Sequence, residues 1–128
     1  MNSAARSALI AAGLLGLTGV ALGAAGAHGP LHDALVAAGA LDAWRTAVLY
    51  HLIHAVALLA LAGWTAGWPG ARWTARCWLA GVILFSGSLY WLALGGPKIL
   101  GPITPLGGLA LLSGWLLLVW NAFRLPKE

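Results

Sequence analysis

Long apolar stretches dominate the chain, and short polar segments separate them. Four stretches lack Asp, Glu, Lys and Arg for long enough to cross a bilayer, which takes about 20 residues of helix. They predict transmembrane spans at about residues 7–27, 45–66, 76–95 and 105–123. In lipid, a helix satisfies every backbone group within its own segment. The pattern therefore predicts an all-α integral membrane four-helix bundle, with residues 1–128 forming a single four-span domain.

The first apolar stretch has a second interpretation. Arg6, the apolar run and Ala25-Gly26-Ala27 resemble a signal peptide with a small-residue cleavage site. The run is longer, however, than the roughly 7–15 apolar residues of a signal-peptide core. We therefore expect a retained transmembrane helix.

A short helical pattern lies between the first two spans. Pro30 suits the first position of a helix, and Gly39 suits the residue just past its end. The apolar residues between them share one helical face: Leu31, Ala34, Leu35 and Ala38. We expect a short interfacial helix on the outer membrane surface.

Helix-start signals precede the second and fourth spans. Asp42 is of a residue type that caps helix N-termini. Thr104 can also cap, and Pro105 after it suits the first helical position, where its missing N–H costs nothing. We expect the second span to begin after Asp42 and the fourth to begin at Pro105.

The composition agrees with lipid surroundings. Charged residues make up 8% of the chain and hydrophobic residues 61%, whereas soluble proteins carry roughly 25% charged residues. The 7 basic residues outnumber the 3 acidic ones, but they are scattered singly and form no patch. We therefore expect the lipid bilayer as a partner and no nucleic acid.

The basic residues predict the orientation of the spans. One side carries most of them: Arg6, Arg72, Arg76, Arg124 and Lys127. The other side carries Arg45 and Lys98. Basic residues collect on the cytoplasmic side of membrane proteins, so both termini are expected in the cytoplasm.

Five tryptophans fall near the expected span ends: Trp44, Trp64, Trp68, Trp73 and Trp120. An indole has an apolar body and one N–H group, which suits the level of the lipid headgroups. We expect these residues to form an interfacial aromatic belt.

Small residues indicate where helices pack closely, because close approach drives helix association in lipid. The first span carries a stripe of them at a spacing of four: Ala4, Ala8, Ala12 and Gly16. Gly19 and Gly23 follow as a GxxxG pair, and Ala110 and Gly114 repeat the spacing in the fourth span. We expect the first helix to be buried against neighbours. The Gly19 and Gly23 face is expected to contact either the same bundle or a second copy, which would make a homo-oligomer.

Polar residues inside the spans are the candidates for function, because they are costly in lipid. His51 and His54 lie three apart on the second span. One polar residue from each span falls at a similar depth, roughly 12–15 Å below the outer boundary: Thr18, His54, Ser86 and Ser113. We expect this layer to face inward and predict a hydrogen bond between His54 and Ser86. The layer either joins the helices or forms a ligand site.

A metal site is weakly indicated. The four histidines are the weak candidates: His28, His32, His51 and His54. The first two are expected outside the membrane and the last two inside it, and neither pair has the H-E-x-x-H pattern. No nucleophile, P-loop or paired-carboxylate motif is present. The sequence favours a non-enzymatic protein, with the cofactor unknown and no metal expected.

Four segments resemble the YgdD/YwdK-like family of small four-span membrane proteins. They are GAAGAHG at 23–29, TAVLYHLIHA at 46–55, LFSGSLY at 84–90 and LGPITPLGG at 100–108. The resemblance implies a bacterial inner-membrane protein with mitochondrial relatives, and it implies no activity. The residues that match the family's motifs are our candidates for ligand binding: His28, His54, Ser86, Ser88, Tyr90 and Thr104. His51 matches the family less well.

Three functions remain open at this point. The first is a non-enzymatic accessory or scaffold subunit, which needs only packed helices. The second is a binder or conductor of a lipid, quinone or proton at the outer-leaflet polar layer. The third is a haem- or metal-binding redox protein that uses the histidines.

Overall fold

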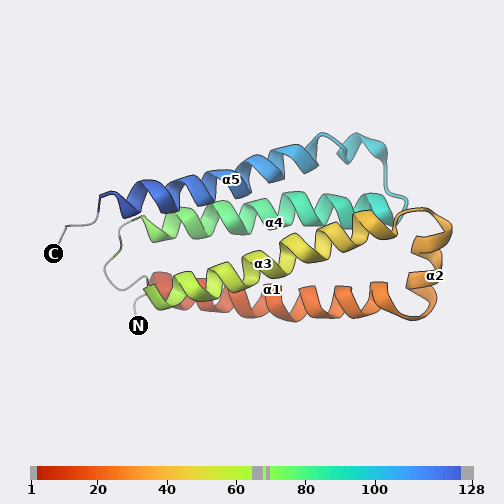
Figure 1. Ribbon diagram of the computed structural model, residues 1–128, viewed down its shortest axis with the longest axis horizontal. Helices are drawn as coiled ribbons and strands as arrows, with labels where there is room; N and C mark the ends of the chain where they lie inside the picture. Colours follow the sequence, from red (N-terminus) through yellow and green to blue (C-terminus); the bar gives the residue numbers. More distant parts are fainter. Residues whose placement is uncertain (1–2, 65–67, 69, 125–128) are drawn as a thin grey trace.

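The computed structural model describes residues 3–64, 68 and 70–124. Five α-helices follow one another in this part of the chain: α1 (Ser3–Ala27), α2 (Gly29–Ala37), α3 (Leu41–Trp64), α4 (Ala71–Ala93) and α5 (Ile103–Ala122). A single 3₁₀ turn, η1 (Lys98–Leu100), precedes α5. Figure 1 shows four long helices side by side, with the short α2 across one end.

Four helical segments are long and apolar enough to cross a membrane: Ser3–Ala27, Leu41–Gly63, Ala71–Ala93 and Lys98–Ala122. They contain 23 to 25 residues each. At about 1.5 Å per residue, such a helix extends over roughly 35 Å, slightly more than the hydrocarbon thickness of about 30 Å. The helix ends therefore reach the headgroup region.

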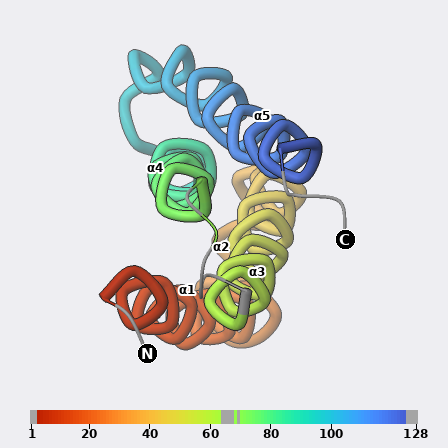
Figure 2. The backbone as a smooth tube through the Cα atoms, turned by 90° about the vertical axis from the view of Figure 1, so that its left-hand side faces the viewer, coloured from red at the N-terminus to blue at the C-terminus, as the bar shows by residue number. Residues whose placement is uncertain are grey.

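The helices pack in the order in which they follow along the chain, with the short α2 set aside. Helix α1 lies along α3, α3 along α4, and α4 along α5. Figure 2 shows α1 and α5 on opposite sides of the bundle, with α3 and α4 between them. The two outer helices consequently present most of their apolar surface to the surroundings, as Leu14, Leu17 and Leu116 illustrate.

The two ends of the bundle differ in charge. The start of α1, the end of α3, the start of α4 and the end of α5 meet at one end (Figure 1). We call it the arginine end after four residues there: Arg6, Arg72, Arg76 and Arg124. The opposite end, where α2 lies, is called the α2 end. Of the residues in the expected charge pattern, Lys127 lies outside the described residues.

Two clusters of buried apolar side chains hold the helices together. The larger one joins α1, α3, α4 and α5 and includes Leu58, Trp78, Val82 and Leu111. The smaller one lies at the α2 end and contains Leu35, Trp44 and Ala93. Trp44 thus belongs to a core and not to an interfacial belt.

The expected aromatic belt is only partly present. Trp73 and Trp120 are exposed near the arginine end, where Arg76 and Arg124 lie over their rings. Trp68 is partly buried against the larger cluster. The side chain of Trp64 lies outside the described part of the structure.

Glycines on α4 and α5 allow the closest helix approach. A Cβ on Gly107 would strike the backbone of Phe85, and a Cβ on Gly81 would strike Leu111. Gly114 accommodates the indole of Trp78 in the same way. This pair of helices therefore packs backbone to backbone, as small-xxx-small spacing favours in lipid.

The first helix is less buried than its small-residue stripe predicts. Ala8 and Ala12 of that stripe are buried, whereas no described residue from another helix lies within 4 Å of a Cβ on Gly16. The reason is that α1 is an outer helix, with one main neighbour. Gly19 and Gly23 face Leu52 and Val48 of α3 in the same chain, and self-association stays a prediction.

The short helix α2 forms as the Pro30 and Gly39 signals predict. Pro30 lies in the first turn of α2. Gly29, just before Pro30, has a φ of 76°, and Gly39, just past the end of the helix, has a φ of 64°. Glycine adopts such values without steric cost. Leu35 turns inward and packs with Trp44 in the smaller cluster, which fixes α2 across the end of the bundle.

Two predicted helix starts are wrong by two residues each. Helix α3 begins at Leu41, so Asp42 lies in its first turn and pairs with Arg45 at 3.7 Å. Helix α5 begins at Ile103 with Pro102 at the N-cap. Thr104 does not cap it, because its hydroxyl pairs with another helix.

Candidate functional site

His51 joins three helices through its two ring nitrogens. Its Nε2 lies 3.2 Å from the Thr18 hydroxyl of α1, and its Nδ1 lies 3.1 Å from the Tyr90 hydroxyl of α4. The Thr18 hydroxyl also donates to the Leu14 carbonyl at 2.8 Å. That bond uses its only proton, so Thr18 accepts from Nε2–H and Tyr90 donates to Nδ1 of the neutral ring.

His54 has the opposite tautomer. Its Nδ1 lies 2.8 Å from the Tyr50 carbonyl, one turn earlier in α3, and can only donate to that oxygen. Its Nε2 accepts from the indole N–H of Trp115 on α5, at 3.1 Å. Both nitrogens are thereby used, and 2% of the side chain is exposed.

Hydroxyl groups join the remaining helix pairs. The Ser86 hydroxyl of α4 donates to the Ala47 carbonyl of α3 at 2.8 Å. Ser88 of α4 lies 2.7 Å from the Thr104 hydroxyl of α5. We call these residues the polar layer: Thr18, His51, His54, Ser86, Ser88, Tyr90, Thr104 and Trp115. It links α1 to α3, α3 to α4, α3 to α5 and α4 to α5.

Aromatic rings surround both histidines. The Trp78 and Trp115 ring centroids are 4.6 Å apart, and each lies about 6 Å from His54, at 6.1 and 6.0 Å. Tyr90 packs on Trp44 with centroids 4.7 Å apart and lies 5.9 Å from His51. The rings exclude lipid tails from the imidazoles and hold them in one orientation.

The predicted hydrogen bond between His54 and Ser86 is wrong. Ser86 bonds to the Ala47 carbonyl, and His54 bonds to Tyr50 and Trp115. The two side chains lie at a similar depth, but depth does not fix which way each helix is rotated.

Ser113 does not join the layer. Its hydroxyl donates to the Leu109 carbonyl of its own helix, on an exposed surface. A hydroxyl in lipid can be satisfied by the preceding turn of its own helix, which removes the need for an inward partner.

The outer histidines lie apart from the polar layer. His28 is the exposed N-cap residue of α2 and makes no side-chain cap bond. His32 Nδ1 lies 2.9 Å from the Gly26 carbonyl. Within the described ranges, no three His, Cys, Asp or Glu side chains come together as a metal ion would require. The structure thus does not bring His28 to the other candidate residues. Of those, Ser88 and Thr104 bond to each other, whereas His54, Ser86 and Tyr90 bond to residues outside the candidate set.

Trp115 is the member of the polar layer that is not predicted from the sequence. Trp115 lies twelve residues into α5, roughly 18 Å from its start, well away from the interface that indoles favour. A tryptophan at that depth needs an acceptor for its N–H. That requirement is a signal in the sequence that could have identified Trp115 but was not used.

Sequence comparison places the chain among membrane proteins. UPF0382 membrane protein YwdK of Bacillus subtilis is 41% identical over 111 residues, which cover 84% of this chain and 89% of that protein. A UPF0382 membrane protein of Haemophilus influenzae is 40% identical over 112 residues, 87% and 89% of the two chains. One of Schizosaccharomyces pombe is 41% identical over 110 residues, 81% and 91%.

The family itself is described as a protein of unknown function, DUF423, and its match covers residues 22–108. No solved structure matches the chain. The names of the relatives state a membrane location and no activity. With its four membrane-length helices, the chain is a small multi-pass membrane protein that belongs to the DUF423 family.

Proposed function

We propose that the chain is a non-enzymatic accessory or scaffold protein of the bacterial inner membrane. The supporting observation is the state of the two buried histidines. His51 and His54 are 5% and 2% exposed, and all four ring nitrogens have partners within the chain. Groups that bind a ligand need free donors or acceptors, and these are already used to join helices.

The proposal also rests on how the polar layer is distributed. Helix-to-helix hydrogen bonds in membranes contribute about 0.6 kcal/mol each on average. Their larger effect is to fix rotation and register, because a mismatched polar group in hydrocarbon costs several kcal/mol. A bundle with fixed register presents constant outer surfaces on α1 and α5, which is what a scaffold requires.

Photo-crosslinking in native membranes tests the scaffold role. A photoreactive amino acid is placed singly at exposed Leu14, Leu17, Leu112 or Leu116. A scaffold gives a discrete protein adduct from one of the two outer helices, and the same probe at buried Leu58 gives none. Adducts with lipid alone at all four exposed positions contradict the proposal.

The charge pattern supports an orientation with both termini in the cytoplasm. The arginine end carries four arginines, whereas Arg45 at the α2 end lies 3.7 Å from Asp42. Basic residues favour the cytoplasmic side. In a Cys77→Ser background, a membrane-impermeant maleimide on intact cells should label Ala37→Cys and leave Ser3→Cys unlabelled. The reverse labelling pattern would refute this orientation.

A second candidate is a binder or conductor of a proton or quinone. The observation in its favour is the continuous bonded series from Thr18 through His51 to Tyr90, because Thr18 is exposed on α1. A photoreactive quinone should then label wild-type protein near Tyr90 and label Tyr90→Phe less. Equal labelling of both proteins counts against it.

The ligand-binding role of the motif residues stays a prediction, as does a haem or metal. The absorption spectrum and metal content of the purified protein decide the latter. A Soret band or a stoichiometric metal would overturn the non-enzymatic proposal in favour of a redox protein.

A further inference from the structure

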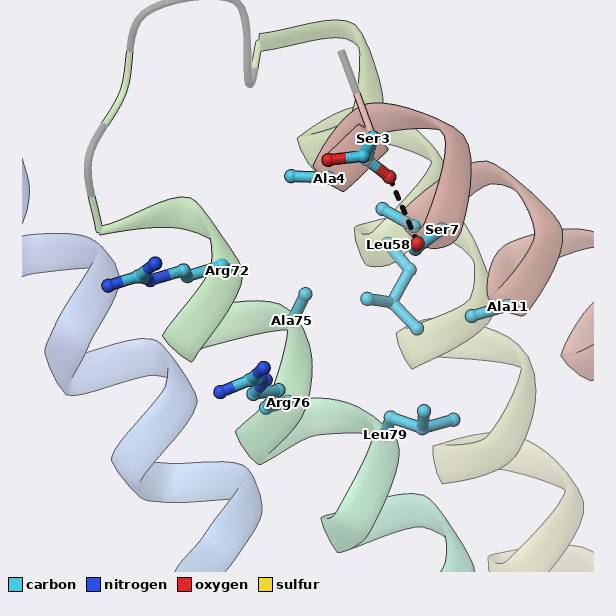
Figure 3. A pocket seen from close by; sticks show the side chains of 10 residues that line it. Ser3, Ala4, Ser7, Ala11, Leu58, Arg72, Ala75, Arg76 and Leu79 are labelled. Carbon is cyan, nitrogen blue, oxygen red and sulfur yellow. Dashed lines mark hydrogen bonds between the residues drawn. The ribbon is translucent and has the colours of Figure 1, made fainter.

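A pocket opens at the arginine end between α1, α3 and α4. Its volume is about 390 Å³, within the roughly 300–1,000 Å³ that ligand pockets occupy. Figure 3 shows Ser3, Ser7 and Ala11 on the α1 side, facing Ala75 and Leu79 of α4, with Leu58 of α3 between the two helices. None of its lining residues belongs to the polar layer, although Leu58 lies one turn from His54 along α3.

Small residues on both walls create this space. Ala4, Ala8 and Ala11 line it from α1, and Ala75 lines it from α4. Alanine side chains at these positions leave the space between α1 and α4 open. Leu58 and Leu79 supply the larger apolar surface of the pocket. The walls therefore suit an apolar chain.

The rim is cationic. Arg72 and Arg76 line the pocket from the first turns of α4. In Figure 3 the guanidinium group of Arg72 extends to the side of α4 that faces away from α1, so its charge lies at the edge of the pocket and not inside it. The acidic residues in the described part of the chain, Asp33 and Asp42, lie at the α2 end. Asp42 forms its ion pair with Arg45. The two arginines thus have no carboxylate to neutralise them among the described residues.

Trp73 keeps both guanidinium groups at the membrane boundary. Their Cζ atoms lie 5.6 Å (Arg72) and 4.8 Å (Arg76) from the Trp73 ring centroid, within cation–π range. The indole is half exposed and favours the interface. The positive charges are therefore at the depth of lipid phosphates.

The arginines are also the charged donors available for recognition. The Ser7 hydroxyl donates to the Ser3 carbonyl at 2.9 Å, so its single proton is already used. Guanidinium groups bind phosphate oxygens with paired N–H donors. Basic pockets between transmembrane helices are a recurring type of site for anionic lipid headgroups.

We propose that this pocket binds an anionic phospholipid. Its phosphodiester accepts hydrogen bonds from Arg72 and Arg76, and one acyl chain lies along Ala8, Leu58 and Leu79. The proposal goes beyond the scaffold role and does not depend on it, because no residue of the polar layer lines the pocket.

Lipid retention in nanodiscs tests this assignment. Wild-type protein and the Arg72→Gln/Arg76→Gln variant are reconstituted in phosphatidylcholine with a small fraction of spin-labelled phosphatidylglycerol. We expect wild-type protein to immobilise phosphatidylglycerol in preference to spin-labelled phosphatidylcholine. Each arginine near an anionic headgroup contributes about 1 kcal/mol, so the double variant should lose this preference by roughly ten-fold or more.

The matched control removes the same charge from the same end. Arg6→Gln/Arg124→Gln neutralises two exposed arginines that do not line the pocket. It should retain most of the preference. If it loses as much as Arg72→Gln/Arg76→Gln, the effect is one of surface charge and the pocket assignment is wrong.

A third variant fills the pocket without changing charge. Ser7→Phe places a ring among the pocket walls and keeps both arginines. It should also lower the preference for phosphatidylglycerol. Each variant must match the wild type in helix content and monodispersity. If the arginine variant fails this check, Arg76→Gln alone replaces it, and if Ser7→Phe fails, Ala4→Phe replaces it. Unchanged preference for phosphatidylglycerol in either kind of variant overturns the proposal.

Discussion

The indole nitrogen of Trp115 donates to Nε2 of His54 across 3.1 Å and joins the fourth spanning helix to the second. Helices α3 and α5 each pack along α4, and their backbones make little direct contact with each other. The indole of Trp78, from α4, packs against the rings of both His54 and Trp115. The bond thus holds three helices at mid-depth.

Replacing Trp115 with Phe should destabilise the bundle by about 1 kcal/mol, because Nε2 of the buried His54 loses its donor. The free energy of unfolding is measured by SDS titration from mild-detergent micelles. Trp120→Phe is the matched control, since Trp120 is 58% exposed, and it should change that free energy by less than about 0.5 kcal/mol. Equal losses in both variants would show that the bond contributes nothing.

The two histidines should have opposite neutral tautomers. Nδ1 of His54 must carry a proton to bond the Tyr50 carbonyl, whereas Nε2 of His51 must carry one to bond Thr18. Nitrogen-15 NMR of histidine-labelled protein distinguishes protonated from unprotonated ring nitrogens. The same tautomer in both rings would mean that at least one of these hydrogen bonds is absent.

The sequence predicts the elements well because each has a local cause. Spans follow from runs that lipid accepts, and α2 follows from Pro30 and Gly39 acting on its own backbone. Pairing of polar side chains is not local. His54 and Ser86 lie at similar depths, yet one bonds Trp115 and the other a backbone carbonyl. Helix rotation decides between such partners, and it depends on packing contacts such as Gly107 against Phe85.

Gly107 and Gly108 provide a test of that packing at neighbouring positions. A Cβ on Gly107 would overlap the backbone of Phe85, whereas a Cβ on Gly108 would lie 3.8 Å from the Phe85 ring. Gly107→Ala should therefore cost about 1–3 kcal/mol of unfolding free energy through overpacking. Gly108→Ala should be neutral or slightly stabilising, because alanine favours helix. If both variants unfold alike, α4 and α5 are not in backbone contact there.

The same substitution should have opposite effects at two threonines. Thr74 is 0% exposed and its hydroxyl has no partner among the residues that the structure describes. Thr74→Val therefore removes an unsatisfied polar group and should stabilise the protein by about 1 kcal/mol. Thr104→Val removes the 2.7 Å bond to Ser88 and should destabilise it by about 0.5–1 kcal/mol. Unfolding in SDS reports both, and a loss of stability in Thr74→Val would indicate an unrecognised partner for its hydroxyl.

Leu35 should be the residue that keeps α2 attached to the bundle. Its side chain is 1% exposed and packs with Trp44, whereas the adjacent Val36 is 53% exposed. Leu35→Ala removes buried apolar volume in a segment outside the spans, which costs about 2 kcal/mol or more. A nine-residue helix cannot persist alone in water, so backbone amides of α2 should exchange with deuterium faster while those of α3 and α4 stay protected. Val36→Ala should leave the exchange of α2 unchanged, and if both variants exchange at the wild-type rate, α2 is held by its flanking turns and not by Leu35.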